Sequence, residues 1–144
     1  MPIATDAAQA GRQATIHRAG SGVERAPASI ANAPFWVETL VEGAGDGEVG
    51  AMRVFLDPGT VPHWHEHPCG QILYALTGLG LMQRAGGPIE ELRAGDCVAF
   101  APGERHWHGA AATSPFSYIS IQAARAGRTV TWHEPVYAEE GRAP

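Results

Sequence analysis

Five of the seven histidines in this 144-residue chain lie in two short segments. The first segment, residues 59–78, reads GTVPHWHEHPCGQILYALTG and places His63, His65 and His67 at alternate positions. The second segment, residues 95–109, reads GDCVAFAPGERHWHG and ends in another pair of histidines two residues apart. Imidazole nitrogens are common ligands of divalent transition metals. The clustering therefore predicts a metal site.

The spacing indicates which side chains can share one ion. Side chains two residues apart on a β-strand point to the same side, so His65 and His67 can bind one ion together. Gln71 has the same parity, and His106 would have to come from a neighbouring strand to close the site. Three imidazoles and one amide oxygen suit manganese, iron, nickel or zinc. All four groups are neutral, so the ion would keep its full charge and favour an anion or alkoxide at its open positions.

The elements that must position these residues are predicted to be strands. Eighteen glycines and eleven prolines separate short apolar runs, which is typical of an all-β fold with many turns. Strands are expected at 35–41, 50–56, 71–77, 97–101, 116–123 and 129–132, with a hairpin formed by 80–84 and 89–93. No segment has a convincing helical period. A closed or sandwich-like β-barrel would bury so many short strands without exposed edges.

The same alternation divides side chains between the two faces of each strand. Met52 and Val54 share one face of the second expected strand, and Tyr118 and Gln122 share one face of the strand at 116–123. Trp64 and Trp107 are expected to pack on the face opposite to the histidines, as core or interface.

The chain is long enough for one domain. Residues 1–33, rich in alanine, glycine and small polar residues, are predicted to form a flexible arm, partly ordered by packing on the barrel or on a neighbouring subunit. Residues 34–136 would form the barrel and residues 137–144 a polar tail.

Charge and composition exclude several classes of partner. The net charge is −5 and no two basic residues are adjacent, which argues against nucleic acid and anionic membrane surfaces. No apolar run has membrane length, and no secretory signal is visible at the N-terminus. Two cysteines do not make a disulfide framework, so a cytoplasmic location is expected.

The two histidine segments resemble the two motifs of the cupin superfamily. The first family motif runs glycine, five residues, His-x-His, three or four residues, glutamate, six residues, glycine. Its positions fall on Gly59, His65, His67, Gln71 and Gly78, with glutamine in place of the usual glutamate. The second motif falls on Gly95-Asp96, Pro102-Gly103 and His106, with one additional residue before Pro102. The resemblance implies a single-domain double-stranded β-helix, or jelly-roll, barrel whose cavity holds a metal bound by His65, His67, Gln71 and His106. Cupins of this size are usually homodimers or homotetramers.

A narrower resemblance is carried by WHEHPCGQ, PGERHWHGAA and the strand that ends in Ile-Gln. These segments are similar to the small manganese cupins that include bacterial hydroxynitrile lyases, which implies Mn(II) as the metal. Those lyases also have a histidine at the position of His108 and a glutamine at that of Gln122. The chain departs from them at Tyr118, where they have a histidine, at His63, where they have a small residue, and at Met52, where they have alanine.

Three functions are compatible with these residues. The first is a metal-dependent lyase for a small hydroxylated molecule such as a cyanohydrin, with His108 as the proton shuttle and His63 or Tyr118 as lesser candidates. Its substrate pocket would be formed by Met52, Val54, Leu73 and Gln122. The second is an O₂-dependent dioxygenase, and the third is a non-catalytic binder of a metal and a small ligand. Each candidate also has a structural alternative: Gln71, Tyr118 or Gln122 as a barrel hydrogen-bonder, His108 in a structural hydrogen bond, and His63 facing solvent.

Overall fold

The computed structural model describes residues 13–137, and in this range the chain is almost entirely β-structure. The strands are β1 Val23–Arg25, β2 Trp36–Val41, β3 Val49–Leu56, β4 His65–Glu66, β5 Gln71–Arg84, β6 Glu90–Arg93, β7 Cys97–Phe100, β8 His106–Ala110, β9 Phe116–Ala123 and β10 Thr131–Trp132. One 3₁₀ turn, Ala28–Ile30, is the helical element of the described residues. None of these residues forms a helix able to cross a membrane. The all-β prediction is confirmed.

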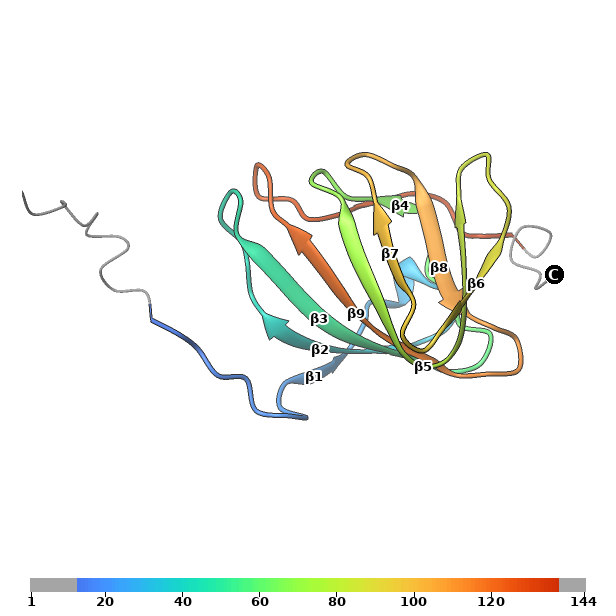
Figure 1. Ribbon diagram of the computed structural model, residues 1–144, viewed down its shortest axis with the longest axis horizontal. Coiled ribbons are helices and arrows are strands. Elements are labelled where there is room, and N and C mark those ends of the chain that lie inside the picture. Colours follow the sequence, from blue (N-terminus) through green and yellow to red (C-terminus); the bar gives the residue numbers. More distant parts are fainter. Residues whose placement is uncertain (1–12, 138–144) are drawn as a thin grey trace, which may run out of the picture.

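Two antiparallel sheets share the long strand β5 (Figure 1). The first half of β5 pairs with β9 and β7, in the sheet that continues through β3 and β2 to β1. Its second half pairs with β8 and β6, and β8 leads through β4 to β10. The sheets therefore curl into the predicted jelly-roll barrel, with the histidine strands β4 and β8 in one wall.

The passage of β5 from one sheet to the other depends on Gly78. This residue has φ = 79°, a backbone conformation that side chains other than glycine rarely adopt. A Cβ atom at this position would also collide with the carbonyl oxygen of Pro115. The glycine that closes the first histidine motif is therefore required by the bend.

The barrel has two apolar cores, one on each side of the histidine strands. The inner core includes Val54, Leu73, Phe100 and Phe116, and lines the floor of the barrel. The outer core contains Trp64, Leu81, Trp107 and Ala111. The two tryptophans thus pack on the face opposite to the histidines, as predicted.

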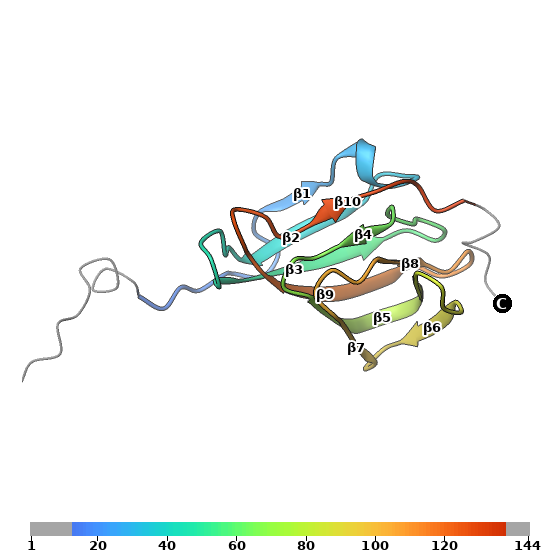
Figure 2. The same ribbon diagram turned by 90° about the horizontal axis from the view of Figure 1, so that it is seen from above.

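The N-terminal boundary of the barrel differs from the prediction of an arm over residues 1–33. Strand β1 pairs with β2, and Ala26 and Ala31 are buried. The side chain of Asn32 donates to the carbonyl of Gly59 and accepts from the amide of Val61. Residues 23–33 therefore belong to the barrel wall (Figure 2). A short strand and side-chain hydrogen bonds hold them in place, and because neither requires a repeating pattern of apolar residues, the sequence did not indicate this part of the wall. Residues 1–12, and all of the expected tail except Tyr137, lie outside the described range.

Candidate functional site

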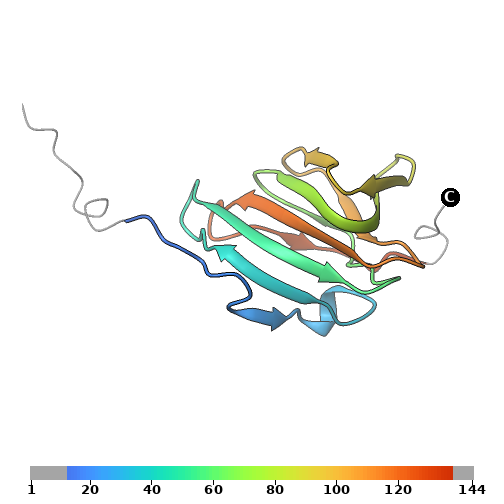
Figure 3. The ribbon, with the colours of Figure 1, turned by 60° about the horizontal axis from the view of Figure 1, so that its bottom comes forward.

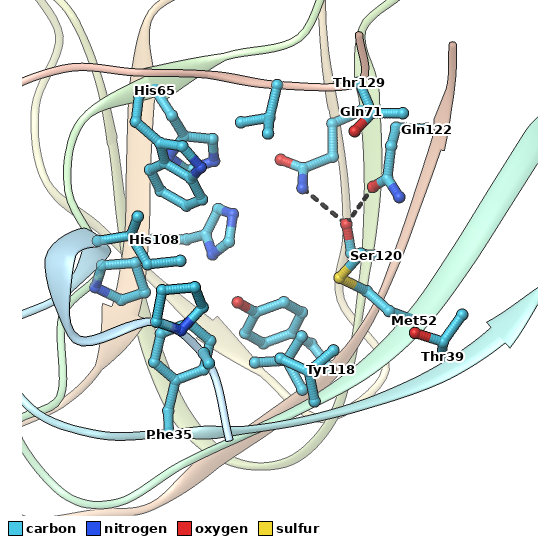
Figure 4. Close-up of a pocket in the computed structure, with 18 of the residues that line it drawn as sticks. Phe35, Thr39, Met52, His65, Gln71, His108, Tyr118, Ser120, Gln122 and Thr129 are labelled. Carbon is cyan, nitrogen blue, oxygen red and sulfur yellow. Dashed lines mark hydrogen bonds between the residues drawn. The ribbon is translucent and has the colours of Figure 1, made fainter. Parts of the chain in front are cut away.

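A cavity of about 290 Å³ opens inside the barrel, between the histidine strands and the sheet formed by β2, β3 and β9. Segments from both ends of the described chain also line it. The lining residues are Glu24, Arg25, Ala26, Pro27, Ile30, Phe35, Val37, Thr39, Met52, Val54, Pro62, His65, His67, Gln71, His108, Tyr118, Ser120, Gln122, Thr129, Val130 and Trp132. Figure 4 shows His108 projecting toward the centre, with apolar side chains on one side and a polar group around Ser120 on the other.

Three histidines at the wall of this cavity have one ring nitrogen fixed by a backbone carbonyl. Nδ1 of His65 lies 2.9 Å from the oxygen of His63, Nδ1 of His67 lies 2.5 Å from that of Thr129, and Nδ1 of His106 lies 2.8 Å from that of Glu104. A carbonyl can only accept, so each Nδ1 carries the proton. Each neutral ring consequently presents the lone pair of Nε2, which is the usual arrangement of a metal-binding histidine.

A chain of side-chain hydrogen bonds fixes the orientation of Gln71. The hydroxyl of Ser120 donates its single proton to Oε1 of Gln122 at 2.6 Å. Ser120 must therefore accept from the amide nitrogen of Gln71, which is 2.7 Å away (Figure 4). This leaves Oε1 of Gln71 directed at Nε2 of His106, 2.9 Å away.

The donor set around Gln71 fits a cation. Oε1 of Gln71 and Nε2 of a neutral His106 are both acceptors, so no hydrogen bond between the protein groups satisfies this pair. Nε2 of His67 is buried and has no hydrogen-bond partner among the described residues. A divalent ion near these lone pairs would satisfy them, as it would Nε2 of His65. One ring nitrogen from each of His65, His106 and His108 also lies within 4.8 Å of the other two.

His108 differs from the other histidines because neither of its ring nitrogens has a partner in the described structure, although both are buried. Its ring centroid is 5.0 Å from that of His65 and 4.9 Å from that of Tyr118. It belongs to β8, two residues after His106, so both side chains point into the barrel. His108 is therefore free to exchange a proton with a molecule in the cavity.

Burial keeps the histidines neutral near pH 7. Desolvation is the main cause that lowers the pKa of His65 and His108 well below 6.5, and the neighbouring histidines lower both further. The pKa of His106 falls to about 4, again mainly because of burial. Burial has the opposite effect on Tyr118 and raises the pKa of its phenol, so this group stays protonated. Tyr118 can donate a hydrogen bond but cannot serve as a base.

The structure brings most of the predicted site residues together. Met52, Val54, Tyr118 and Gln122 line the cavity, as the alternation of their strands indicates. Leu73, predicted for the substrate pocket, is instead fully buried in the inner core and does not line the cavity, although its cross-strand partner Ser120 does. His63, the lesser candidate for proton transfer, does not line the cavity either, and its contribution to the site is the carbonyl that fixes His65.

Other cavity residues were not anticipated from the sequence. Phe35 and Ile30 cover the cavity from the N-terminal side, and Val130 and Trp132 cover it from the C-terminal side. Strand β10 pairs with β4 and places Trp132 opposite His65, and the centroids of the two rings lie 4.7 Å apart. Their position in the cavity depends on pairing between distant segments, although Phe35, Val130 and Trp132 lie within the strands expected at 35–41 and 129–132.

Comparisons with known proteins agree with this geometry. A family model described as a cupin domain matches residues 52–122. The chain is 38% identical over 128 residues to the (R)-mandelonitrile lyase of Granulicella tundricola, covering 88% of this chain and 98% of that protein. A cupin-like protein from Thermotoga maritima is 33% identical, with a TM-score of 0.76, over 88% of this chain and 94% of that one. A polyketide cyclase from Streptomyces resistomycificus, 16% identical over 90% of each chain with a TM-score of 0.66, shares the fold.

Proposed function

The chain belongs to the cupin family, and within this family we propose that it is a metal-dependent hydroxynitrile lyase. The substrate class is that of small aromatic cyanohydrins such as mandelonitrile. The observation that carries the proposal is His108, a neutral imidazole to which no residue of 13–137 donates or accepts a hydrogen bond, beside three fixed histidines in a largely apolar cavity. The similarity to (R)-mandelonitrile lyase over nearly its whole length supports the same reaction.

In this proposal one divalent metal ion, Mn(II), is held by His65, His67, Gln71 and His106. The three histidines are chosen because a backbone carbonyl fixes each of them with Nε2 free. One ring nitrogen of His108 also lies within 4.8 Å of ring nitrogens of His65 and His106. No backbone carbonyl in the described structure fixes the His108 ring, so His108 is assigned to proton transfer and not to metal binding. When bound, the ion supplies positive charge that stabilises negative charge on the substrate oxygen.

His108 then acts as the base and afterwards as the acid. Its neutral ring accepts the hydroxyl proton of the cyanohydrin, while the electron pair of the O–H bond forms the carbonyl double bond. The bond between the carbinol carbon and the nitrile carbon breaks, and its electron pair leaves with cyanide. The proton returns from His108 to cyanide, so the products are an aldehyde and hydrogen cyanide.

The remaining cavity residues orient the substrate. Phe35, Met52 and Val54 form an apolar surface for the aromatic ring. Tyr118, which keeps its proton, can donate a hydrogen bond to the nitrile or the hydroxyl group. Phe35 lies away from the group of Gln71, Ser120 and Gln122, whereas Met52 lies beside Ser120 and pairs with it across β3 and β9 (Figure 4).

The proposal is tested by following benzaldehyde release from racemic mandelonitrile with the manganese-loaded protein, in air and without oxygen. We expect the same rate in both conditions, because the reaction contains no oxidation. A rate that depends on oxygen would favour the dioxygenase hypothesis. No benzaldehyde release, together with retained binding of aromatic alcohols or aldehydes, would favour a non-catalytic binder.

A further inference from the structure

Two polar side chains of β9, Ser120 and Gln122, are buried beside the proposed metal site although neither is a proposed ligand. Ser120 is 3% exposed and Gln122 is 6% exposed. Strand β9 runs between β3 and β5 in the larger sheet (Figure 3), so both side chains lie next to Gln71 at the start of β5. Buried polar groups need hydrogen-bond partners. These two residues find them in each other and in Gln71.

The hydrogen bonds of this chain of three side chains have a direction. Oε1 of Gln122 can only accept, so the hydroxyl of Ser120 gives its one proton to this oxygen, 2.6 Å away. Only lone pairs of Ser120 then remain for Gln71, and they accept from its amide nitrogen at 2.7 Å. The amide oxygen of Gln71 is consequently directed at Nε2 of His106, 2.9 Å away.

A half-turn of the Gln71 amide would exchange its oxygen and nitrogen at nearly the same positions. In the turned orientation Ser120 would donate to the amide oxygen, and the amide nitrogen would donate to Nε2 of His106. This Nε2 is an acceptor because Nδ1 of the same ring donates to the carbonyl of Glu104. The turned amide would therefore use the lone pair of His106 and would present N–H groups, which bind no cation. Only the orientation found in the structure makes Gln71 a metal ligand.

We propose that Gln122 is a positioning residue of the metal site: by accepting the proton of Ser120, it holds the amide oxygen of Gln71 in place as a ligand. This inference rests on the proposed metal site and extends it to a side chain two hydrogen bonds away from Gln71. The chain of hydrogen bonds is buried along its whole length, so solvent does not readily replace a missing partner. The effect of Gln122 on the metal needs no substrate, which separates it from the substrate contact expected for this residue.

The test is the affinity for Mn(II), measured on the full-length protein by competition with a fluorescent chelator, for the wild type, Gln122→Leu, Ser120→Ala and the double variant. Leucine has no acceptor, so the proton of Ser120 would turn to the amide oxygen of Gln71. We expect Gln122→Leu and Ser120→Ala each to weaken binding about tenfold or more. The double variant should match Ser120→Ala within about twofold, because Gln122 reaches Gln71 only through the hydroxyl. Effects that multiply in the double variant would show independent action and would overturn the proposal.

Gln83→Leu is the matched control. Gln83 is another partly buried glutamine of β5, and its amide oxygen accepts from Nε1 of Trp107, outside the cavity. Its replacement also removes a side-chain hydrogen bond from the barrel but should leave the affinity for Mn(II) unchanged. Equal weakening in Gln83→Leu and Gln122→Leu would point to a general loss of packing and would overturn the proposal. If Gln122→Leu loses its near-UV circular dichroism, Gln122→Met replaces it, because the thioether is only a weak acceptor.

Nuclear Overhauser effects in the metal-free protein report the direction of the Gln71 amide itself. We expect its amide protons to contact Ser120 in the wild type and the ring of His106 in Gln122→Leu. The same contacts in both proteins would contradict the proposal. A wild type that binds no Mn(II) would overturn the metal site and this inference together. Tight binding by the wild type with unchanged affinity in Gln122→Leu would overturn this inference alone.

Discussion

The imidazole of His108 is buried and has no hydrogen-bond partner among the described residues, which leads to a prediction about stability as well as activity. Because no described residue bonds to either ring nitrogen, a substitution at this position breaks no hydrogen bond within the protein. Leucine has a similar size and no polar atoms, and the adjoining cavity tolerates small differences in shape. We therefore expect His108→Leu to change the free energy of unfolding of the metal-free protein by less than about 1 kcal/mol. The same change should lower the rate of mandelonitrile cleavage by about 10²- to 10⁴-fold, because the proton carrier is lost.

His106→Leu is the matched control for this experiment. Nδ1 of His106 donates to the carbonyl of Glu104, and its ring stacks on Phe100 at 3.5 Å between centroids. Its removal should lower the free energy of unfolding by about 1–3 kcal/mol, a larger loss than in His108→Leu.

Urea unfolding near pH 7.5, followed by circular dichroism, measures both changes. At this pH the two histidines are neutral in the folded protein, because burial lowers their pKa values. Manganese content should be unchanged in His108→Leu and reduced in His106→Leu. A loss of more than about 1 kcal/mol in His108→Leu would show that its nitrogens have a stabilising partner, and would refute the assignment of His108 as a free base.

Three further predictions concern other parts of the molecule. Gln71→Ala should weaken manganese binding about 10-fold or more, with little change in fold, because it removes the amide oxygen directed at His106. Competition with a fluorescent chelator measures this affinity, and an unchanged affinity would show that Gln71 is not a metal ligand. Gly78→Ala should lower the free energy of unfolding by at least about 2 kcal/mol in urea titrations, because the new Cβ meets Pro115 and the backbone has positive φ. Gly86→Ala, at a turn where a Cβ would meet no neighbour, should lower the free energy of unfolding by a smaller amount. The hydrogen bond from His17 is the main cause that lowers the pKa of Glu38 from 4.5, so the stabilisation by the Glu38 carboxylate is complete above pH 4.5 and is lost as the pH falls through the lower pKa of the folded state. Glu38→Gln should therefore make the free energy of unfolding depend less on pH in the acid range. An unchanged pH dependence would show that the hydrogen bond between His17 and Glu38 is not coupled to folding.

Much of the fold is predictable because its strands have a clear period of two. The strand at 116–123 has the bounds that the sequence indicates, and the expected hairpin of 80–84 and 89–93 forms from β5 and β6. The inward position of Tyr118 and Gln122 follows from the same alternation. The histidine spacing also carries real information, since the two segments meet through the pairing of His65 with His106.

The parts that sequence reasoning missed depend on contacts between distant residues. The short β1 and the turn at 28–30 have no apolar period, and their order comes from Asn32 and from pairing with β2. Leu73 has the parity of a cavity residue, but parity gives no depth along the barrel axis, and the core surrounds this side chain. His63 shares the alternate spacing of its neighbours, yet it precedes β4, which begins at His65, and its amide donates to the carbonyl of Ile30. The period of two predicts which face of a strand a side chain occupies. Which segments close the cavity depends on how the whole barrel assembles.

The central claim, a cyanohydrin lyase that depends on one metal ion, is tested most directly by titrating Mn(II) into metal-free protein while benzaldehyde release from mandelonitrile is measured. We predict negligible release before the addition, a linear rise, and a plateau at one ion per chain. The ligand variants His65→Ala and His67→Ala should show no plateau at this ratio. Metal-free protein as active as the loaded protein, or loaded protein that releases no benzaldehyde, would contradict the account.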